Sequence, residues 1–521
     1  MSFKHYVSTS ASVLAILAAG LLSTTALAQR PMTPLPGQSH HVGPYQAPYV
    51  APPAIKSGTW TSMKNAYPGS FPETALLLTD GTAMVHEGCT GTWYKLTPDN
   101  TGNYQKGTWK KLGSMPSGYA PLYFASQVLP DGRVIVNGGE YNNCSGVWTT
   151  KGALYDPVAD KWTDVPPPSG WTTIGDAQSV VRTDKVYQLA NCCDLDSALA
   201  SISGNNVTWT TLTSGQTHKA DDNDEEGWTT QPNQTVLTVD TWNCIHDTTS
   251  CTEIFDTGTN TWSAGNRTCA QLVDASSHEI GPGPLLPNGF VFYAGGTAKN
   301  CILDTSTGQW SNAPSFGSND SADGPAVVLP SGNALFQVSP GVFNAPSHFY
   351  EAQVVDANTV TVKQVNEPAS APNQSSYEGR FLMLPTGQVL WTSDVNDVQI
   401  YTPKGKAKAA WAPKIKGVAA TLSVGSNNNK LKGKNLNGFT FGGYYGDDAE
   451  MSTNYPIIRI TNTGTGHVCY ARTHDHSTMG ISNGSPGSTK FDIPAGCETG
   501  ASTLEVIANG IASTSASVTL Q

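Results

Sequence analysis

Charged side chains are scarce in this sequence, and basic residues are fewer than acidic ones. Only 13% of the 521 residues are charged, and 40 Asp and Glu against 29 Lys and Arg give a net charge of −11. This surplus of negative charge is unfavourable for binding nucleic acid or an anionic membrane surface. Long apolar runs are also absent after residue 28, so no membrane span is expected. A neutral or cationic partner suits this composition better.

The first 28 residues have the pattern of a leader. Lys4 and His5 precede the apolar run SVLAILAAGLL, and Ala-Leu-Ala stands just before Gln29. This pattern predicts a secretory signal peptide at residues 1–28, so we expect an exported protein, secreted or periplasmic, that acts as a monomer. Residues 29–56 are rich in proline, lack periodicity and are expected to form a linker.

The ten cysteines are an even number, which in an oxidising compartment favours disulfides. Cys244 and Cys251 bracket the short loop CIHDTTSC and are predicted to pair. Cys469 and Cys497 lie in the same C-terminal region and are a second predicted pair. The neighbours at 192 and 193 could pair with each other only under strain, so we expect each to pair with a more distant cysteine.

A β-hairpin is the repeated unit of the chain. Its clearest copy is YFASQVLPDGRVIVNGGE at 123–140, where two alternating apolar runs flank Pro130-Asp131-Gly132. Seven copies advance by 43 to 55 residues. The residues at the turn position are Thr79, Pro130, Arg182, Pro232, Pro287, Pro330 and Pro385. Seven copies with a period of about 50 residues predict a propeller of the kelch type.

A tryptophan in a strand-like setting precedes six of the seven hairpins and keeps the same period. These residues are Trp60, Trp109, Trp162, Trp209, Trp262 and Trp310, and Val362 fills the seventh place. Trp60 stands before the first hairpin, and no comparable strand follows the last one. We therefore predict that the N-terminal strand completes the last blade and closes the ring, which protects the sheet edges.

The outer hairpins and the C-terminal segment carry a resemblance to a known family. The motifs ALYDPVADKW, EIFDTGTNTW and ILDTSTGQW are kelch-like, as are the Gly-Gly pairs at 138–139 and 295–296. Residues 411–521 contain short alternating stretches with Gly and Asn turns, which predict an immunoglobulin-like sandwich. Together these features resemble kelch-repeat proteins of the galactose oxidase type. The expected fold class is all-β, with a seven-bladed kelch-type β-propeller at 57–405 followed by an immunoglobulin-like (early-set) β-sandwich.

Acidic residues stand just before the inner hairpins of six blades. Because the starts of the innermost strands converge on a propeller's axis, we expect a ring of carboxylates there, where mutual repulsion raises pKa values or recruits a cation. The predicted catalytic set is Tyr377, Glu378, His278, Glu279, Asp323, Glu226 and Asp176. Glu73 and Glu225 belong to the same ring. In the alternative interpretation, each acid caps a backbone N–H or pairs with an arginine of a neighbouring blade.

The segment Thr473-His474-Asp475-His476-Ser477 is a second candidate. Two histidines at i and i+2 lie on the same side of an extended strand and could ligate one metal. In galactose oxidase relatives, a loop of the C-terminal domain sends a histidine into the axis as a copper ligand, so the resemblance implies His474 or His476 in that role, with His278 as a further ligand. A domain-interface role is the alternative. Calcium is the other candidate metal, and the run at 221–226 offers hard oxygen donors for it or forms a solvated acidic loop.

The chain departs from the copper radical oxidases at two places. It has Tyr377-Glu378 where they have a Tyr-His pair, and Phe124-Ala125-Ser126 where they have a cysteine crosslinked to tyrosine. Three functions therefore remain open. They are a metal-dependent enzyme acting on carbohydrates or small alcohols, a glycan hydrolase or lyase that uses ring carboxylates, and a non-catalytic propeller that binds glycan. The stacking faces available for glycan are Trp171, Trp228, Trp242 and Tyr377.

Overall fold

The computed structural model describes residues 54–246 and 250–521. The predicted signal peptide at 1–28 and residues 29–53 of the predicted linker lie outside the described residues.

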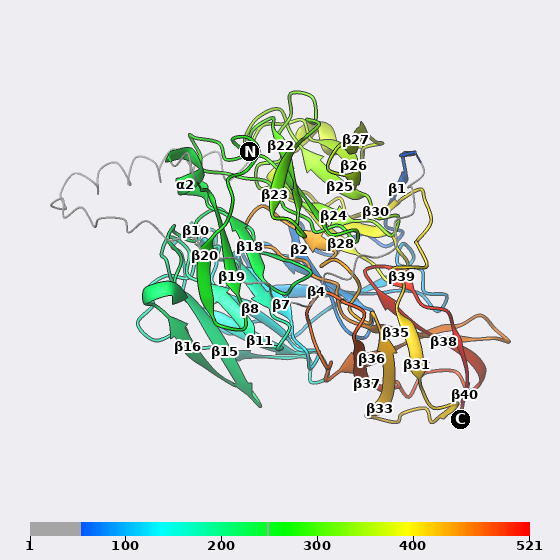
Figure 1. The fold of residues 1–521 in the computed structure, drawn as a ribbon. Coiled ribbons are helices and arrows are strands. Elements are labelled where there is room, and N and C mark those ends of the chain that lie inside the picture. Colours follow the sequence, from blue (N-terminus) through cyan, green and yellow to red (C-terminus); the bar gives the residue numbers. More distant parts are fainter. Residues whose placement is uncertain (1–53, 247–249) are drawn as a thin grey trace.

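Seven antiparallel sheets form the blades of a propeller, each built mainly from consecutive strands (Figure 1). The first blade consists of β2 (Pro72–Leu77), β3 (Ala83–Glu87), β4 (Thr92–Thr97) and β5 (Thr108–Lys111), and the second of β7 (Ala125–Val128), β8 (Val134–Asn137), β11 (Gly152–Asp156) and β12 (Lys161–Asp164). The third blade consists of β13 (Ser179–Val181), β14 (Tyr187–Ala190), β15 (Ser197–Ser203) and β16 (Asn206–Leu212), and the fourth of β17 (Thr229–Thr230), β18 (Val236–Val239), β19 (Thr252–Asp256) and β20 (Thr261–Ala264). The fifth blade consists of β21 (Phe290–Ala294), β22 (Asn300–Asp304) and β23 (Gln309–Ala313). The sixth consists of β24 (Ala326–Val328), β25 (Ala334–Val338), β26 (His348–Asp356) and β27 (Thr359–Gln364). The seventh consists of β28 (Gly379–Met383), β29 (Val389–Ser393), β30 (Gln399–Thr402) and β1 (Thr59–Ser62). A small sheet consists of β6 (Pro121–Leu122), β9 (Tyr141–Asn142) and β10 (Ser145–Gly146). Short helices are η1 (Gly215–Thr217), α2 (Thr241–His246), η2 (Ala371–Asn373) and η3 (Ser376–Glu378).

The two ends of the propeller segment pair with each other. In the seventh blade β1 is the outermost strand, and its register with β30 joins Thr59 to Thr402 and Ser62 to Gln399. This pairing makes a strand from the start of the chain part of the last blade. It leaves the ring without a free end at that point.

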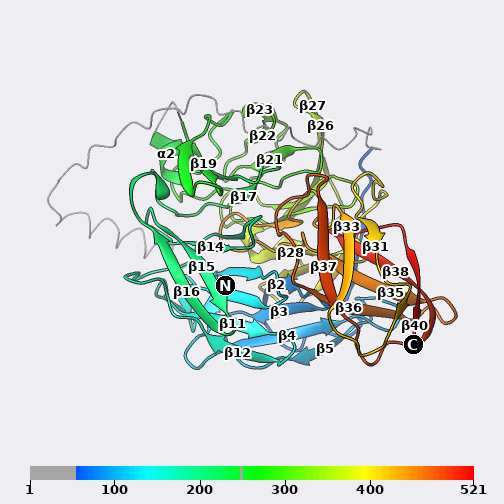
Figure 2. The same cartoon turned by 60° about the horizontal axis from the view of Figure 1, so that its bottom comes forward.

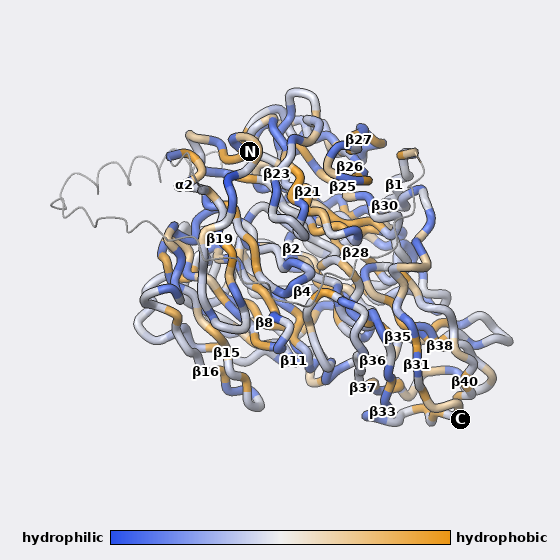
Figure 3. The backbone as a smooth tube through the Cα atoms, in the orientation of Figure 1, coloured by the Kyte–Doolittle hydropathy of each residue, from blue (hydrophilic) through white to orange (hydrophobic). Residues whose placement is uncertain are grey.

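The kelch-like motifs make cross-strand aromatic pairs in the outer hairpins. Tyr155 is opposite Trp162, with ring centroids 4.9 Å apart, and Phe255 is opposite Trp262 at 5.0 Å. Such pairs stabilise a hairpin beyond the area that they bury. The inner strands are buried on both faces, and hydrophobic stretches follow many blade strands in Figure 3. The repeated residues are therefore packing residues of the blades.

A sandwich follows the propeller. Its strands are β31 (Lys414–Gly417), β32 (Thr421–Leu422), β33 (Asn429–Lys434), β35 (Ile457–Asn462), β36 (Val468–His474), β37 (Pro486–Asp492), β38 (Gly500–Ala508), β39 (Ile511–Ala512) and β40 (Ala516–Leu520). They enclose a separate apolar core that includes Leu431, Phe491 and Val506. The predicted fold class, a seven-bladed propeller followed by a β-sandwich, is confirmed.

The segment between β33 and β35 leaves the sandwich and enters the propeller. All residues from 435 to 458 are buried, and β34 (Gly443–Tyr444) pairs with β24 of the sixth blade, with Tyr444 opposite Ala326. A Cβ on Gly446 would lie 2.7 Å from the Asp323 Cα, so glycine lets the backbone approach this blade closely. We call residues 439–451 the axial loop.

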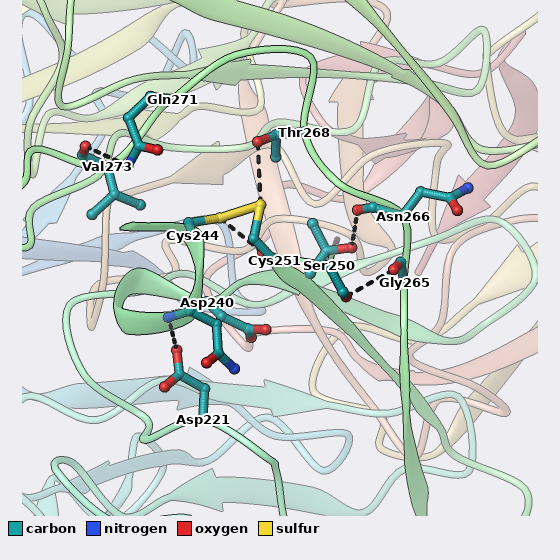
Figure 4. Close-up of a disulfide and its surroundings, with 12 residues drawn as sticks. Asp221, Asp240, Cys244, Ser250, Cys251, Gly265, Asn266, Thr268, Gln271 and Val273 are labelled. Carbon is teal, nitrogen blue, oxygen red and sulfur yellow. Dashed lines mark hydrogen bonds between the residues drawn. A yellow bond between two sulfur atoms is a disulfide. The ribbon is translucent and has the colours of Figure 1, made fainter. Parts of the chain in front are cut away.

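Four disulfides are present. The predicted pairs Cys244–Cys251 and Cys469–Cys497 are confirmed, and Figure 4 shows the first of them, where Cys251 Sγ lies 3.3 Å from Thr268 Oγ1. The other two are Cys89–Cys144 and Cys269–Cys301. The prediction that Cys192 and Cys193 pair with distant cysteines is wrong, because the other eight pair among themselves. These two are free thiols with their Sγ atoms 2.8 Å apart.

None of the described helices is both long enough and apolar enough to cross a membrane.

Candidate functional site

The innermost strands of several blades begin with an unusual backbone conformation. Seven residues before the turn position, Tyr123, Gly175, Glu225 and Asp323 have φ values of 52°, 67°, 50° and 46°. In the fifth blade His278, just before Glu279, has a φ of 65°. For non-glycine residues such conformations are costly, and they cluster at functional sites. The positive φ values thus recur at the start of the inner strands, where the sequence predicts the acidic ring.

Five carboxylates from four blades and the axial loop meet at this position. Ligand atoms of Asp176, Glu225 and Asp447 lie within 4.8 Å of one another, and so do those of Glu225, Glu279 and Asp323. Glu225 belongs to both groups and joins them. We call these five residues the axial cluster. Glu225 is half-buried as a residue, whereas the other four are buried.

The axial cluster makes its own carboxyl groups hard to ionise. Burial raises the pKa of Glu225 well above its usual range, and the neighbouring Glu279, Asp176 and Asp323 raise it further. Burial also raises the pKa of Asp176, with Glu140 and Asp447 adding to the effect. Asp176 and Glu225 therefore favour a proton, or a cation in its place, more than free carboxyl groups do.

An arginine lies on the other side of the axis. Arg380, from β28, is 1% exposed, and its Nη2 atom is 3.3 Å from Glu73 Oε2. Its guanidinium lies over the ring of Tyr445 from the axial loop, 3.9 Å from the centroid, and 5.6 Å from that of Tyr123. These contacts fix a buried positive charge beside the axial loop. Asp448, also on this loop, has its pKa raised well above the usual range by burial and by Asp447.

Tyr377 contacts the arginine through its backbone, and Glu378 bonds to the backbone of its own turn. The Tyr377 carbonyl oxygen accepts hydrogen bonds from Arg380 Nη1 at 2.6 Å and from the Tyr445 hydroxyl at 2.7 Å. Glu378 Oε2 accepts the Ser375 N–H at 2.9 Å, and burial raises the pKa of this carboxyl group. Both predicted residues thus lie at the axis, but neither is in the axial cluster.

Glu226 has a different environment from its neighbour. It is fully buried in the fourth blade and forms an ion pair with Lys219, whose Nζ atom is also 3.5 Å from Asp240 Oδ1. The ammonium group neutralises these acids within the protein. The structure therefore brings Glu225, and not the predicted Glu226, into the axial cluster.

The rim near Glu225 is aromatic and carries the free thiols. Trp242 is 49% exposed, and its ring centroid is 5.1 Å from that of His278. Trp148 is 40% exposed and lies against Gly175, where a Cβ would come within 2.8 Å of its Cδ1 atom. Cys193 Sγ is 3.5 Å from Asp224 Oδ1. His278 is thus a rim residue and belongs to no group of potential metal ligands among the described residues.

His474 and His476 lie at the opposite end of the inner strands. The His476 N–H donates to the Pro130 carbonyl oxygen at 3.2 Å, and Pro130 is the turn residue that ends the strand. His474 Nε2 is 3.1 Å from Asp492 Oδ1, and the His476 ring stacks on Tyr455. Burial lowers the pKa of His476 to about 3. The expectation that this segment enters the axis does not hold, because it packs between the two domains.

Sequence reasoning missed the residues that the axial loop supplies. Tyr445, Asp447 and Asp448 lie between Gly443 and Glu450, in a stretch with no repeat and no metal-binding spacing. The one available signal was an acidic GYYGDDAE segment in a chain with few charges. In the run at 221–226, Asp222 is exposed as expected, but the interpretation of a solvated loop is wrong for Asp221. Asp221 is buried, and its Oδ2 atom accepts the N–H groups of Trp242 and Asn243 at the start of α2.

The axis does not fit the copper centre that the family resemblance implies. Imidazole nitrogens suit copper, whereas carboxylates suit hard cations such as Ca²⁺, Mg²⁺ and Mn²⁺. Two of the three groups of potential ligands among the described residues share Glu225 and contain Asp and Glu only, and the third consists of Cys192, Cys193 and Asp224 at the rim, without a histidine. The inner strand of the second blade begins with Ala125 and Ser126, where those oxidases have the crosslinked cysteine. A hard divalent cation matches this donor set better.

Comparisons with known proteins agree with the fold. No family model matches the chain. A segment of 121 residues, 21% of the chain, is 32% identical to the kelch-like protein terF of Aspergillus terreus, of which it spans about a quarter (26%). A fungal alcohol oxidase of the AA5 family, solved in complex with copper, is 13% identical with a TM-score of 0.49, over 90% of this chain and 99% of that one. YCF48, solved with a D1 peptide, is 12% identical with a TM-score of 0.46, over 69% and 100%. Over the matched segment the chain is thus similar in sequence to a kelch-like protein, in line with the kelch-type repeats expected from the sequence.

Proposed function

We propose that this protein is an exported carbohydrate-active enzyme whose axial cluster holds a hard divalent cation. The observation that supports this proposal is that five carboxylates form two overlapping groups, in each of which the ligand atoms lie within 4.8 Å of one another. Burial, and then repulsion from neighbouring carboxylates, raises the pKa of Glu225 and Asp176, and a divalent cation relieves the repulsion directly. Calcium, with six to eight oxygen ligands, suits a cluster of this size.

The residues around such a cation favour acid–base chemistry on a polyhydroxy substrate. Glu225, Glu279 and Asp323 would be the cation ligands, leaving Asp176 next to Asp447. Burial raises the pKa of Asp176, so its carboxyl group can hold a proton near neutral pH and donate it to a leaving oxygen. The Arg380 guanidinium, held by Glu73 and stacked on Tyr445, supplies a fixed positive charge nearby. This arrangement supports a glycan hydrolase or lyase rather than a copper-dependent alcohol oxidase.

Binding without turnover is the second candidate, and the exposed tryptophans favour it. Trp148 and Trp242 at the rim offer open ring faces, and sugar rings stack on such faces. Of the stacking residues that the sequence suggested, Trp228 and Tyr377 are both 0% exposed and cannot serve. Trp242 and the half-buried Trp171 remain from that set, and Trp148 is added by the structure.

Export is part of the proposal. Four disulfides within a single chain are compatible with an extracellular or periplasmic location, because such bonds persist in oxidising compartments. A small-molecule or carbohydrate substrate would reach the axis past the rim.

Calcium titration followed by activity screening tests the proposal. We expect the metal-free protein to bind about one Ca²⁺ by isothermal titration calorimetry, and to cleave a glycan from a panel only when Ca²⁺ is present. Glu225→Gln and Asp323→Asn should each weaken Ca²⁺ binding at least about tenfold, because each removes a ligand charge. Glu498→Gln, at an exposed pair with His467, is the matched control and should bind normally. Binding of glycan without cleavage would favour the second candidate, and normal Ca²⁺ affinity in both axial variants would contradict the proposed site.

A further inference from the structure

One region of this acidic protein is strongly basic. Residues 404–434 contain eight lysines and no acidic residue, in a chain whose net charge is −11. Five of these lysines belong to the paired strands β31 and β33, and all five are exposed. We call them the lysine face. They are Lys414, Lys416, Lys430, Lys432 and Lys434.

The strand register gathers these lysines on one surface. Along β33, Lys430, Lys432 and Lys434 alternate with Leu431 and Gly433, which are buried, so the three ammonium groups share the solvent face. Lys414 of β31 is directly opposite Lys434, which adds its charge to the same row. Figure 2 shows β31, β33 and β37 side by side on the sandwich.

The charges of this face are not neutralised by the described part of the protein. The ion pairs found there include none of the five lysines, whereas the nearby Lys490 of β37 pairs with Asp475 at 2.8 Å. Like charges directly opposite each other on a sheet are destabilising, and Lys414 faces Lys434 in this way. The arrangement thus carries a cost in stability that the fold does not offset.

Protection of a sheet edge does not explain the face. Lysines on an exposed edge strand do discourage its pairing with another chain, and β31 is such a strand at the end of the sheet. However, β33 lies inside the sheet, paired with β31 on one side and with β37 on the other, and it carries three of the five lysines. An interior strand has no free edge to protect, so its lysines point to a ligand.

We propose that the lysine face binds a linear acidic polysaccharide. Successive lysines of β33 are spaced by about 6.5 Å along the strand, which is two residues of extended chain, and this row suits a polymer with regularly repeated carboxylates. A surface groove of about 480 Å³ runs beside the row and is lined by Lys416, Lys432 and Ser488, among others. The lysine ammonium groups and the serine hydroxyl there can contact sugar carboxylates and hydroxyls together.

Two other polyanions fit this face less well. An anionic membrane is usually met by lysines together with large apolar side chains that enter the lipid, and single-stranded nucleic acid is met by aromatic side chains that stack on bases. The exposed large apolar residues of the described chain are Val147, Trp148, Val158, Trp242 and Val395, all in the propeller. The polysaccharide therefore remains the best match, and its binding does not depend on the function proposed for the axis.

The test is binding of the full-length mature protein to polygalacturonate, measured by biolayer interferometry at low and moderate salt. We expect the triple variant Lys430→Gln/Lys432→Gln/Lys434→Gln to bind about tenfold more weakly or worse, with a shallower salt dependence, because three counterion-releasing contacts are lost. The control Lys64→Gln/Lys111→Gln/Lys161→Gln removes the same charge from exposed propeller positions and should bind normally. A smaller variant, Lys414→Gln/Lys416→Gln, should show an intermediate loss, and thermal unfolding checks that each variant is folded.

Three outcomes would overturn the inference. Equal losses in the triple variant and in its control would show that only overall charge matters. Absence of polygalacturonate binding at low salt would remove the ligand. Tighter binding to phosphatidylserine vesicles or to single-stranded DNA than to polygalacturonate, lost in the same triple variant, would assign the face to a different partner.

Discussion

Glu225 and Glu226 are neighbours in the sequence, but the structure places their carboxyl groups in opposite electrostatic environments. Glu226 is buried beside Lys219, so its charge is neutralised by a cation that belongs to the protein. Glu225 is surrounded by Glu279, Asp176 and Asp323, and the carboxylates around it all raise its pKa. The first site contains its own counter-charge, although burial still raises the pKa of Glu226 to about 8, whereas the carboxyl groups of the second favour a proton or a metal ion from outside. Two adjacent residues of one acidic run can thus have different roles, Glu226 in an ion pair within a blade and Glu225 in the proposed cation site.

The largest effect expected is from removing the cation of the structural pair. Lys219→Met should lower the free energy of unfolding by about 3–5 kcal/mol, because it leaves Glu226 and Asp240 buried without a counter-charge. Urea unfolding followed by tryptophan fluorescence measures this loss. Added Ca²⁺ should not restore the stability, and a full rescue by Ca²⁺ would erase the contrast between the two sites.

The matching change in the axial cluster should act in the opposite direction. In a chelator at neutral pH, Glu225→Gln should raise the free energy of unfolding by about 1–2 kcal/mol, because it removes one of several carboxylates that repel each other. The same urea experiment measures the gain. In saturating Ca²⁺ the variant should instead be less stable than the unchanged protein. A loss of stability under both conditions would mean that Glu225 has a structural role like that of Glu226.

The pH dependence of stability should report the same contrast. The folded-state pKa values of Asp176, Glu225 and Asp448 are raised above the unfolded values near about 4, so their stabilising contribution is complete below that pH and is lost as pH rises through the folded pKa. In a chelator, thermal melts between about pH 5 and about pH 8 should show falling stability, by up to about 1.4 kcal/mol per pH unit for each proton released. Ca²⁺ should flatten the profile, and a profile that is already flat in the chelator would contradict the raised pKa values.

The smallest effect is expected at the start of the same acidic run. Asp221 accepts the N–H groups of Trp242 and Asn243, so Asp221→Ala should cost about 1 kcal/mol through the lost cap of α2. Ca²⁺ affinity should stay unchanged in this variant. A clear loss of Ca²⁺ binding in calorimetry would place the cation in the 221–226 run and away from the axis.

The fold could be predicted because its signals repeat. The hairpin turns mark all seven units, the outer tryptophans mark six of them and the kelch-like motifs three, so a departure in one unit, such as Val362 in place of Trp, changes little. The pairing of β1 with β30 also follows from this count. The pairing of Cys192 and Cys193 was predicted wrongly, because cysteine spacing alone does not say which other cysteines face each other in space.

The site was predictable only where it follows the repeat. The position of the acids before each hairpin gave Asp176, Glu279 and Asp323, but the left-handed conformation at Glu225 decides which of two adjacent glutamates faces the axis. The axial loop has no repeat, and its entry depends on tertiary packing of 435–458 against the blades. The histidines at 474 and 476 had a recognisable spacing, yet the strand that carries them ends at the hairpin turns.

The most direct test is an anomalous difference map from crystals of the mature protein soaked in MnCl₂, since Mn²⁺ takes hard oxygen ligands and scatters anomalously. The account predicts one strong peak among the carboxylate oxygens of Glu225, Glu279 and Asp323, absent from crystals of the Glu225→Gln variant. A peak on the His474–His476 segment or on the 221–224 run, with none at the axis, would contradict it.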